Sequence, residues 1–208
     1  MPVASVAAVA STRETGGATS RNFTMPTVQT GDVAVIAFNS YAAVNPTLSG
    51  LGWTTQAPIV ESTNGGATCS VWTKVVNATD SGTTITLASG YTKCVLLCSV
   101  YRGATEIIST TAGPASGVWH SSYTPLGFTP ATDKVLVQCI TLGTGANTFT
   151  ASTPPSGITV RSEQGTGGTE NTAGGVIGDI LTSNTDFTGD GPAIPAYANI
   201  CLNGRRFS

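Results

Sequence analysis

Apolar and β-branched residues recur along the chain in short runs, and most of these runs end at Gly, Pro, Asn or Asp residues. Runs of this length and composition, bounded by turn-forming residues, are typical of β-strands. Two runs, 33–38 and 93–101, are apolar at nearly every position, which is expected of strands that are buried on both faces. The other strands that the pattern predicts in the first half are 3–10, 21–28, 58–63, 67–76 and 83–88. No segment keeps a helical spacing of apolar residues for more than two turns.

Three turn-forming segments indicate how the predicted strands connect. Asn64-Gly65-Gly66 lies between two predicted strands and favours a tight hairpin, because these residues tolerate positive φ angles. Gln29-Thr-Gly-Asp32 leads into the apolar run 33–38, and Asp80-Ser-Gly82 leads into the run 83–88. We expect the Asp side chains of both turns to accept hydrogen bonds from the turn backbone.

The second half of the chain resembles the first at an offset of about one hundred residues. The corresponding segments are 23–36 and 123–137, 52–54 and 157–159, and 98–103 and 199–204. The two quasi-repeated halves, about 3–103 and 107–204, each have too few strands to cover their own sheet faces. We therefore predict one all-β domain over residues 1–208: a single antiparallel β-sandwich, jelly-roll-like, with weak internal duplication. Two similar small sandwiches are the alternative.

Charge is scarce in this chain. Charged residues make up 10% of it, against roughly 25% in an average soluble domain. The net charge is −2, and the nine Lys and Arg residues are scattered, so they cannot form the basic stripe that nucleic-acid binding requires. A surface this poor in charge suits a protein that is packed against copies of itself or against partners.

The amino terminus lacks the basic and apolar regions of a signal peptide, and no apolar run approaches the ~20 residues that cross a bilayer. We therefore expect a protein that folds in the cytoplasm and inserts into no membrane. An odd number of cysteines without a secretion signal predicts reduced, buried thiols rather than disulfides. On a strand, Cys94 and Cys98 would point to the same face. The five cysteines are Cys69, Cys94, Cys98, Cys139 and Cys201.

Several short motifs follow one another in a fixed order. They are Val28-Gln-Thr-Gly-Asp32-Val-Ala-Val-Ile-Ala37, Gly52-Trp53-Thr54, Val71-Trp-Thr-Lys-Val-Val76, Asp80-Ser-Gly-Thr-Thr-Ile-Thr86, Val100-Tyr-Arg-Gly103 and Thr153-Pro-Pro-Ser-Gly157-Ile-Thr-Val-Arg161. In this order they resemble a β-sandwich family that is common among the virion structural proteins of bacteriophages, notably phages of actinobacteria, over roughly residues 3–204. The motifs are fold signatures. The resemblance implies a minor tail, tail-fibre-associated or capsid-accessory protein, and it carries over no catalytic residue.

The candidate catalytic and metal-binding groups lack the spacing that their chemistry needs. No Glu-x-Asp-x-Glu ladder places paired carboxylates on one strand face, as expected of a glycosidase sandwich. Asp186–Gly191 has oxygen ligands but not the spacing of a calcium loop. His120 has no Gly-x-Ser-x-Gly elbow beside it, and with Trp119 and Tyr123 it would suit a small contact patch. We therefore predict no catalytic, cofactor or metal site.

These observations predict a non-enzymatic bacteriophage virion protein that acts through protein–protein interfaces. It would be an accessory subunit of the capsid surface (decoration) or of the tail (a minor tail protein), and its partners would be copies of itself, as a homo-oligomer, and other virion proteins. The alternative is a carbohydrate-binding module or host-surface adhesin that binds a host-surface glycan. That alternative needs exposed aromatic rings, whereas Trp53 and Trp72 fall in the core pattern of the family. We expect Trp53 to lie inside the sandwich, which leaves Trp119 as the exposed ring.

Overall fold

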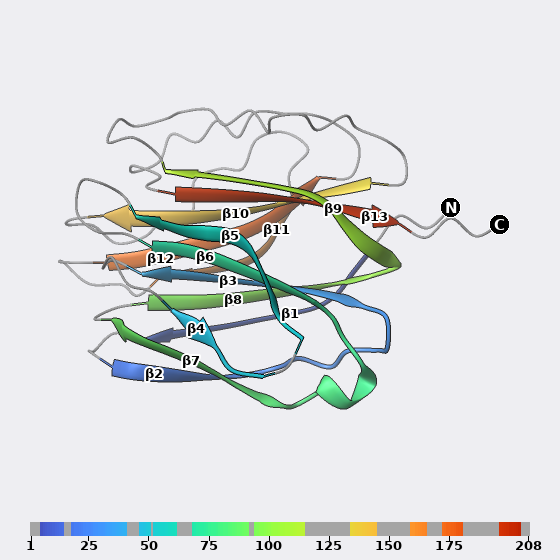
Figure 1. The fold of residues 1–208 in the computed structure, drawn as a ribbon, viewed down its shortest axis with the longest axis horizontal. Helices are drawn as coiled ribbons and strands as arrows, with labels where there is room; N and C mark the ends of the chain where they lie inside the picture. The colour runs from blue at the N-terminus through green and yellow to red at the C-terminus, as the bar shows by residue number, and fades with distance from the viewer. Residues whose placement is uncertain are drawn as a thin grey trace.

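The computed structural model describes residues 5–14, 18–40, 46–50, 52–61, 68–91, 94–114, 134–144, 159–165, 172–180 and 196–204. Within these ranges the chain forms thirteen β-strands and one 3₁₀-helix, η1 (Figure 1). This confirms the all-β prediction. No helix in the described ranges is long and apolar enough to cross a membrane. The elements are β1 (Ser5–Glu14), β2 (Ala18–Thr24), β3 (Val33–Ser40), β4 (Thr47–Leu48), β5 (Thr54–Glu61), β6 (Thr68–Val75), η1 (Ala78–Asp80), β7 (Thr84–Tyr91), β8 (Cys94–Arg102), β9 (Ala104–Pro114), β10 (Lys134–Thr144), β11 (Thr159–Gly165), β12 (Thr172–Ile180) and β13 (Ala196–Gly204).

The strands form three antiparallel sheets. Sheet A has the order β1-β8-β3-β6-β5, sheet B the order β2-β7-β4, and sheet C the order β11-β12-β10-β13-β9. Sheets A and C lie against each other, with β1 near β11 at one edge, β8 near β12, and β5 near β9 at the other edge. Figure 1 shows β9 and β13 at the top of the view, β3 and β8 below them, and β2 and β7 at the bottom.

The two five-stranded sheets have the same strand order when strands are counted along the chain within each sheet. In both, the first strand lies at one edge, the second in the centre, the third at the other edge, the fourth beside the third, and the fifth beside the first. This order makes β3 equivalent to β10 and β8 equivalent to β13, and these pairs contain segments that resemble each other in the sequence. The jelly-roll topology and the duplication of the two halves stay predictions.

Sheet A is the middle layer, and its central strands are therefore buried on both faces. Every residue of β3 is buried, and β8 is buried up to Tyr101. Alternate side chains of a strand point to opposite faces. Ile36 and Leu96 point toward sheet B and share its core cluster, whereas Tyr101 points toward Asp179 of sheet C. The continuous apolar runs 33–38 and 93–101 thus reflect cover by two sheets, and sheet B is a layer beyond the predicted two-sheet sandwich.

The contact between sheets A and B is an apolar cluster. Its buried members are Phe23, Met25, Val28, Ala34, Ile36, Phe38, Trp72, Val76, Ile85, Leu87, Cys94, Leu96, Cys98 and Val100, with Leu48 and Trp53 packed against them. Burying a Leu or Phe side chain contributes about 1.5–3 kcal/mol, so this cluster holds the short sheet B in place. Cys94 and Cys98 both belong to it, which confirms that they share a face.

The cysteines that the structure describes carry buried thiols, as the sequence predicted. Cys94, Cys98 and Cys139 are in no disulfide. Burial raises the pKa of the Cys98 thiol to about 12, because the thiolate would lose its hydration. The side chains of Cys69 and Cys201 lie outside the described part of the structure.

Four strands differ in their bounds from the prediction. β1 was expected at 3–10 and spans Ser5–Glu14, and β7 was expected at 83–88 and spans Thr84–Tyr91. β2 was expected at 21–28 and spans Ala18–Thr24, because Pro26 has no N–H to extend the pairing with β7. β5 was expected at 58–63 and spans Thr54–Glu61. Pro58 is tolerated within β5 because this strand is the edge of sheet A and its pairing with β6 is irregular there. The antiparallel pairing of β5 with β6 agrees with the predicted hairpin, whose turn residues 64–66 lie outside the described residues.

Candidate functional site

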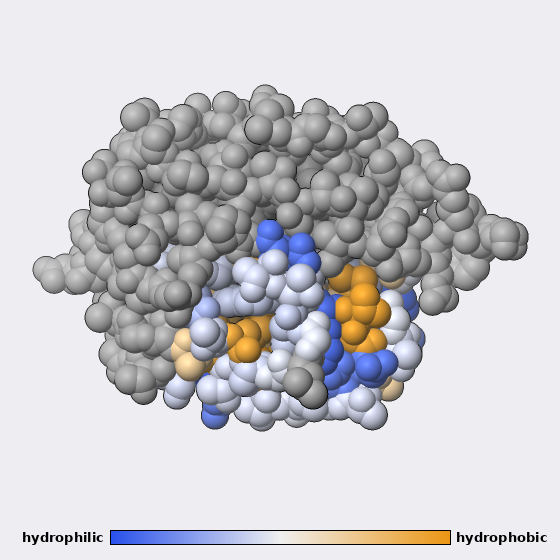
Figure 2. All heavy atoms as spheres, viewed as in Figure 1, coloured by the Kyte–Doolittle hydropathy of each residue, from blue (hydrophilic) through white to orange (hydrophobic). Residues whose placement is uncertain are grey.

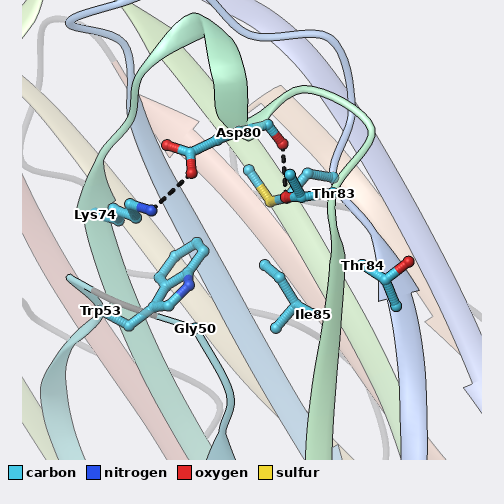
Figure 3. A pocket seen from close by; sticks show the side chains of 8 residues that line it. Gly50, Trp53, Lys74, Asp80, Thr83, Thr84 and Ile85 are labelled. Carbon is cyan, nitrogen blue, oxygen red and sulfur yellow. Dashed lines mark hydrogen bonds and ion pairs between the residues drawn. The ribbon is translucent and has the colours of Figure 1, made fainter.

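A pocket of about 260 Å³ opens where the start of β5, the end of β6 and the start of β7 meet (Figure 3). Its lining residues are Met25, Gly50, Trp53, Lys74, Asp80, Thr83, Thr84 and Ile85. Figure 3 shows Trp53 and Ile85 on opposite sides of the pocket, with Lys74 and Asp80 together at one end. The pocket therefore has apolar walls and one charged end.

Two glycines build the backbone around Trp53. Gly50 has a φ angle of 99° and Gly52 one of 83°, both in the region that side chains other than that of glycine rarely adopt. A Cβ atom at Gly50 would lie 3.5 Å from Nε1 of Trp53, so the Gly50 backbone packs closely beside the indole. The Gly-x-Gly-Trp sequence thus turns the chain sharply and places the indole at the mouth of the pocket.

Lys74 and Asp80 form an ion pair at the charged end. Lys74 Nζ donates to Asp80 Oδ1 at 2.8 Å, and the side chains are 15% and 19% exposed. Asp80 Oδ2 accepts a 2.8 Å hydrogen bond from the Asn77 N–H, which holds the carboxylate at the end of η1. The Lys74 ammonium also lies over the Trp53 ring, 5.9 Å from its centroid, in a cation–π contact.

The Asp80 carboxyl is ionised at neutral pH. Burial by itself would raise its pKa, but the hydrogen bonds from Lys74 and from the Asn77 N–H, together with the charge of Lys74, outweigh that effect. The pKa of Asp80 therefore lies below its ordinary value of 3.8. The pair has no net charge, yet it presents a strong donor and a strong acceptor side by side.

Trp53 is partly buried, which corrects the expectation that it lies inside the sandwich. It packs against the margin of the A–B cluster and also lines the pocket. The physical reason is its position. Trp53 immediately precedes β5, which is an edge strand of sheet A, so in the described residues no neighbouring strand of that sheet lies beyond it to cover the indole. Trp72, on the interior strand β6, is 5% exposed and is a core residue, in agreement with its predicted role.

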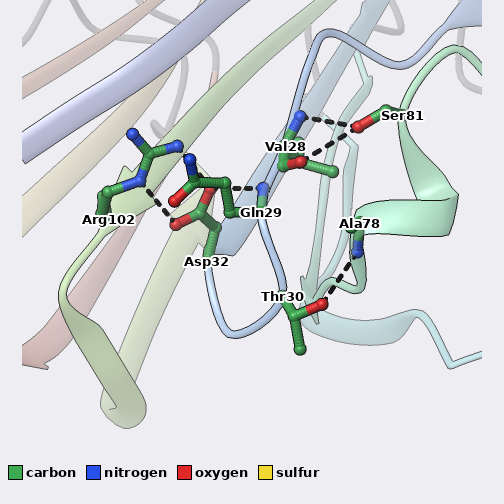
Figure 4. Close-up of polar contacts among 7 residues, drawn as sticks. All are labelled: Val28, Gln29, Thr30, Asp32, Ala78, Ser81 and Arg102. Atoms are coloured by element: carbon green, nitrogen blue, oxygen red, sulfur yellow. Dashed lines mark hydrogen bonds and ion pairs between the residues drawn. The ribbon is translucent and has the colours of Figure 1, made fainter.

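A second polar group, centred on Asp32, ties the turn before β3 to its surroundings (Figure 4). Arg102 Nε donates to Asp32 Oδ1 at 3.2 Å, and the other guanidinium contact, to Oδ2, is 3.1 Å. Oδ2 also accepts a hydrogen bond from the Gln29 N–H, as expected of an Asp that caps its own turn. The Ser81 hydroxyl bonds to both the N–H and the C=O of Val28, which joins this turn to the one after η1. These contacts hold the backbone of the two turns in place. Asp32 is 2% exposed, so it is a structural residue of the turn.

A third polar group lies between sheets A and C. Arg161 Nε donates to Asp179 Oδ2 at 2.8 Å, and Asp179 is 2% exposed. Burial, followed by the nearby Asp179 and Cys139, raises the pKa of Tyr101 well above its ordinary value. Tyr101 on β8 therefore stays protonated, and it lies close to the Asp179–Arg161 pair that joins β12 to β11.

The acidic side chains that the structure describes act as partners in ion pairs. The three whose side chains the structure describes, Asp32, Asp80 and Asp179, each pair with Lys or Arg. In the described residues no group of three His, Cys, Asp or Glu side chains is placed to hold a metal ion. The candidates that fall outside the described residues are Trp119, His120, Tyr123 and the segment 186–191.

The pocket itself was missed by reasoning from the sequence. Its signal was present in Lys74, a lysine inside an otherwise core-like strand pattern, and in the paired glycines before and after residue 51. Neither signal identifies a pocket without knowing that β6 and β7 belong to different sheets. A comparison of the chain with models of known families, with curated proteins and with solved structures finds no match.

Proposed function

We propose that this chain is a non-enzymatic structural protein of a bacteriophage virion. It is an accessory subunit of the capsid surface or a minor tail protein, and it acts through protein–protein interfaces. The observation that carries the proposal is the scarcity of charge, 10% of residues, on a chain built of stacked β-sheets. Small neutral residues cost little to desolvate and lose little side-chain entropy when they are immobilised. Such a surface can therefore be buried without leaving charged groups unpaired.

The visible surface of the described residues supports this proposal. Figure 2 shows it mostly in pale colours, the range of intermediate hydropathy, with separate blue and orange areas. Among the described large hydrophobic residues, Val75 is exposed, at 56%. The described surface is therefore neutral and only moderately hydrophobic, as is typical of non-obligate protein–protein interfaces.

The edges of the sheets offer a second route to assembly. β1 and β5 end sheet A, and β11 and β9 end sheet C. In the described part of the chain each of these strands pairs with one neighbour, which leaves backbone groups on its other side available to another chain. Thr54, on the edge strand β5, is exposed.

The motifs of the family resemblance have structural roles, which also supports the proposal. Gly31 and Gly103 have φ angles of 90° and 80°, so both occupy positions that favour glycine. Asp32 caps its turn and binds Arg102, at the end of β8. Side chains that fix a fold in this way are consistent with a family whose shared residues specify a scaffold rather than a reaction.

The direct test is the location of the chain. Particles of the phage that encodes the chain are purified to constant density and analysed by quantitative mass spectrometry. In a second experiment, particles from a phage with the gene deleted are mixed with the purified full chain and sedimented. We expect the chain in the particle at a fixed copy number and saturable rebinding. Each interface should bury at least about 1,000 Å², the size that separates specific contacts from incidental ones.

Two variants sharpen the test. Thr54→Lys places a charge on the edge strand β5, and the matched control Ala88→Lys places one on the exposed surface of β7, the central strand of sheet B. If the sheet edge is the contact, the first variant weakens self-association or rebinding more than the second. A chain that is absent from the particle, fails to rebind and stays monomeric at high concentration would overturn the proposal.

A further inference from the structure

We propose that the pocket beside Trp53 binds a single neutral sugar unit of a glycan. The sugar ring would pack on the indole, and its hydroxyl groups would bond to Lys74 and Asp80. This inference goes beyond the proposed structural role and does not depend on where in a virion, if anywhere, the chain resides.

The walls of the pocket match the apolar face of a sugar ring. Met25 and Ile85 are 2% and 4% exposed and close one side, while the partly buried Trp53 forms the other. A pyranose ring has a face of C–H groups that packs on such a surface, and aromatic rings provide large, rigid apolar area at little entropic cost. A volume of about 260 Å³ is somewhat below that of pockets for drug-sized ligands, which favours a ligand of one ring.

The charged end matches the hydroxyl groups of a sugar. A lysine ammonium has three donors, and the Lys74–Asp80 contact uses one of them. A carboxylate accepts about four hydrogen bonds, and each oxygen of Asp80 accepts one, from Lys74 and from the Asn77 N–H. Donors and acceptors therefore remain available side by side, and a vicinal diol can use one of each.

The lack of net charge at this end selects for a neutral ligand. A phosphate or carboxylate ligand would gain the attraction of Lys74 but would meet the ionised Asp80, whose pairing with Lys74 it would have to disrupt. Gly50, Thr83 and Thr84 are exposed, so the pocket is open to solvent at its mouth. A ring of about twelve non-hydrogen atoms at ordinary ligand efficiency binds with a Kd in roughly the millimolar range, and several copies on one particle would add avidity.

The test uses the full chain labelled with ¹⁵N at tryptophan, which has three indole N–H signals, one for each Trp. A Trp53→Phe variant identifies the Trp53 signal. The probes are methyl glycosides of hexoses, N-acetylhexosamines, deoxyhexoses and pentoses, with inorganic phosphate as the anionic probe. We expect at least one glycoside to shift the Trp53 signal saturably while the signal of the buried Trp72 stays in place.

The variants separate binding from folding. Asp80→Asn keeps the shape of the side chain but removes its charge, and we expect it to weaken glycoside binding about tenfold, in keeping with the loss of one charge-assisted hydrogen bond. Ala88→Lys serves as the matched control and should bind as the wild type does. Thermal melting of each variant shows whether it is folded, and the wild-type titration decides the matter even if Asp80→Asn does not fold.

Three outcomes would overturn the inference. The first is no saturable shift of the Trp53 signal with any of the glycosides, and the second is equal shifts of all three indole signals. The third is a stronger response to phosphate than to every glycoside, which would indicate an anion site. A chain that binds a glycoside but is absent from the virion would overturn the proposed function and leave this inference intact.

Discussion

In the central strands β3 and β8 both faces of sheet A are buried, yet the two faces are built differently. The face toward sheet B is a nearly continuous apolar cluster that includes Ile36, Phe38 and Leu96. The face toward sheet C also contains apolar residues such as Leu97, but Tyr101 meets Asp179 and its partner Arg161 there. The A–B interface depends on area and shape, while the A–C interface also buries the polar side chains of Tyr101 and Asp179.

This difference bears on how each layer keeps its register. An apolar interface tolerates small shifts, because the hydrophobic effect is not directional. A buried carboxylate that has lost its hydration depends on its partner, so displacement of Asp179 from Arg161 is costly. Arg161 on β11 and Asp179 on β12 both belong to sheet C, so we infer that this pair fixes the register of these two strands, whereas the A–B contact relies on its apolar area.

Removing the cation of the Arg161–Asp179 pair, which joins β11 to β12 within sheet C, should destabilise the protein most. Arg161→Met leaves the carboxylate of Asp179, which is 2% exposed, without its partner, and we expect a loss of about 3–5 kcal/mol in the free energy of unfolding. Urea denaturation followed by circular dichroism measures it. The double variant Arg161→Met/Asp179→Leu should recover much of the loss, since it buries no charge. A single variant as stable as the wild type would contradict the role given to this pair.

Two neighbouring leucines probe the two faces separately. Leu96 and Leu97 are both 0% exposed, and only Leu96 belongs to the A–B cluster. Each Leu→Ala change should cost about 2–5 kcal/mol, because it leaves a cavity in a packed core. Hydrogen exchange should then differ: Leu96→Ala raises exchange mainly in β7, and Leu97→Ala mainly in β10 and β12. Identical exchange patterns in the two variants would show that the layers do not respond separately.

The two tryptophans of the A–B side should differ in their importance for stability. Trp72→Ala should cost about 3–5 kcal/mol, as expected of a buried aromatic residue. Trp53→Ala should cost less than half as much, since Trp53 lies at the margin of the cluster and loses less buried area. Chemical denaturation of both variants makes the comparison. Equal losses would mean that Trp53 is a core residue after all.

The smallest effect concerns the Lys74–Asp80 pair and depends on pH. The pKa of Asp80 is lowered in the folded state, so its contribution to stability is full above its ordinary value of 3.8 and is lost as the pH falls through the lower folded value. The difference in Tm between the wild type and Asp80→Asn should therefore be greatest near neutral pH and should shrink below about pH 4. We expect less than about 1 kcal/mol, because the pair is in contact with solvent. A difference that grows on acidification would show that the sign is wrong.

Reasoning from the sequence succeeded where the pattern reports local burial. The continuous apolar runs 33–38 and 93–101 correspond closely to β3 and β8, and the four-residue spacing placed Cys94 and Cys98 on one face. It did less well on β5, where Pro58 and irregular pairing break the alternation of an edge strand. Sheet B was not foreseen, since a run that is apolar on both faces indicates two covering layers but not which strands form them.

The candidate site shows more clearly what cannot be predicted from the sequence. Lys74 pairs with Asp80, six positions on, and Trp53 is brought against Lys74 by a turn that depends on two glycines with positive φ angles. Each residue by itself fits an ordinary description: a strand lysine, a turn aspartate, a core tryptophan. Their association depends on how the edge of sheet A meets the end of sheet B, which is tertiary information that no local pattern contains.

The strand order of the two large sheets also sets a constraint on how the chain folds as it is synthesised. In each sheet the first strand pairs with the last one of the same half, so Ser5 of β1 lies opposite Arg102 of β8, and Ala104 of β9 lies opposite Gly204 of β13. Such distant pairings have a high contact order and slow folding, because the entropic cost of closing a long loop comes before any stabilising contact forms. Sheet A cannot be completed until β8 has left the ribosome, and sheet C must wait for nearly the whole chain. The strand β1 therefore stays unpaired until β8 has been made, and its low net charge leaves it open to pairing with other chains during that interval.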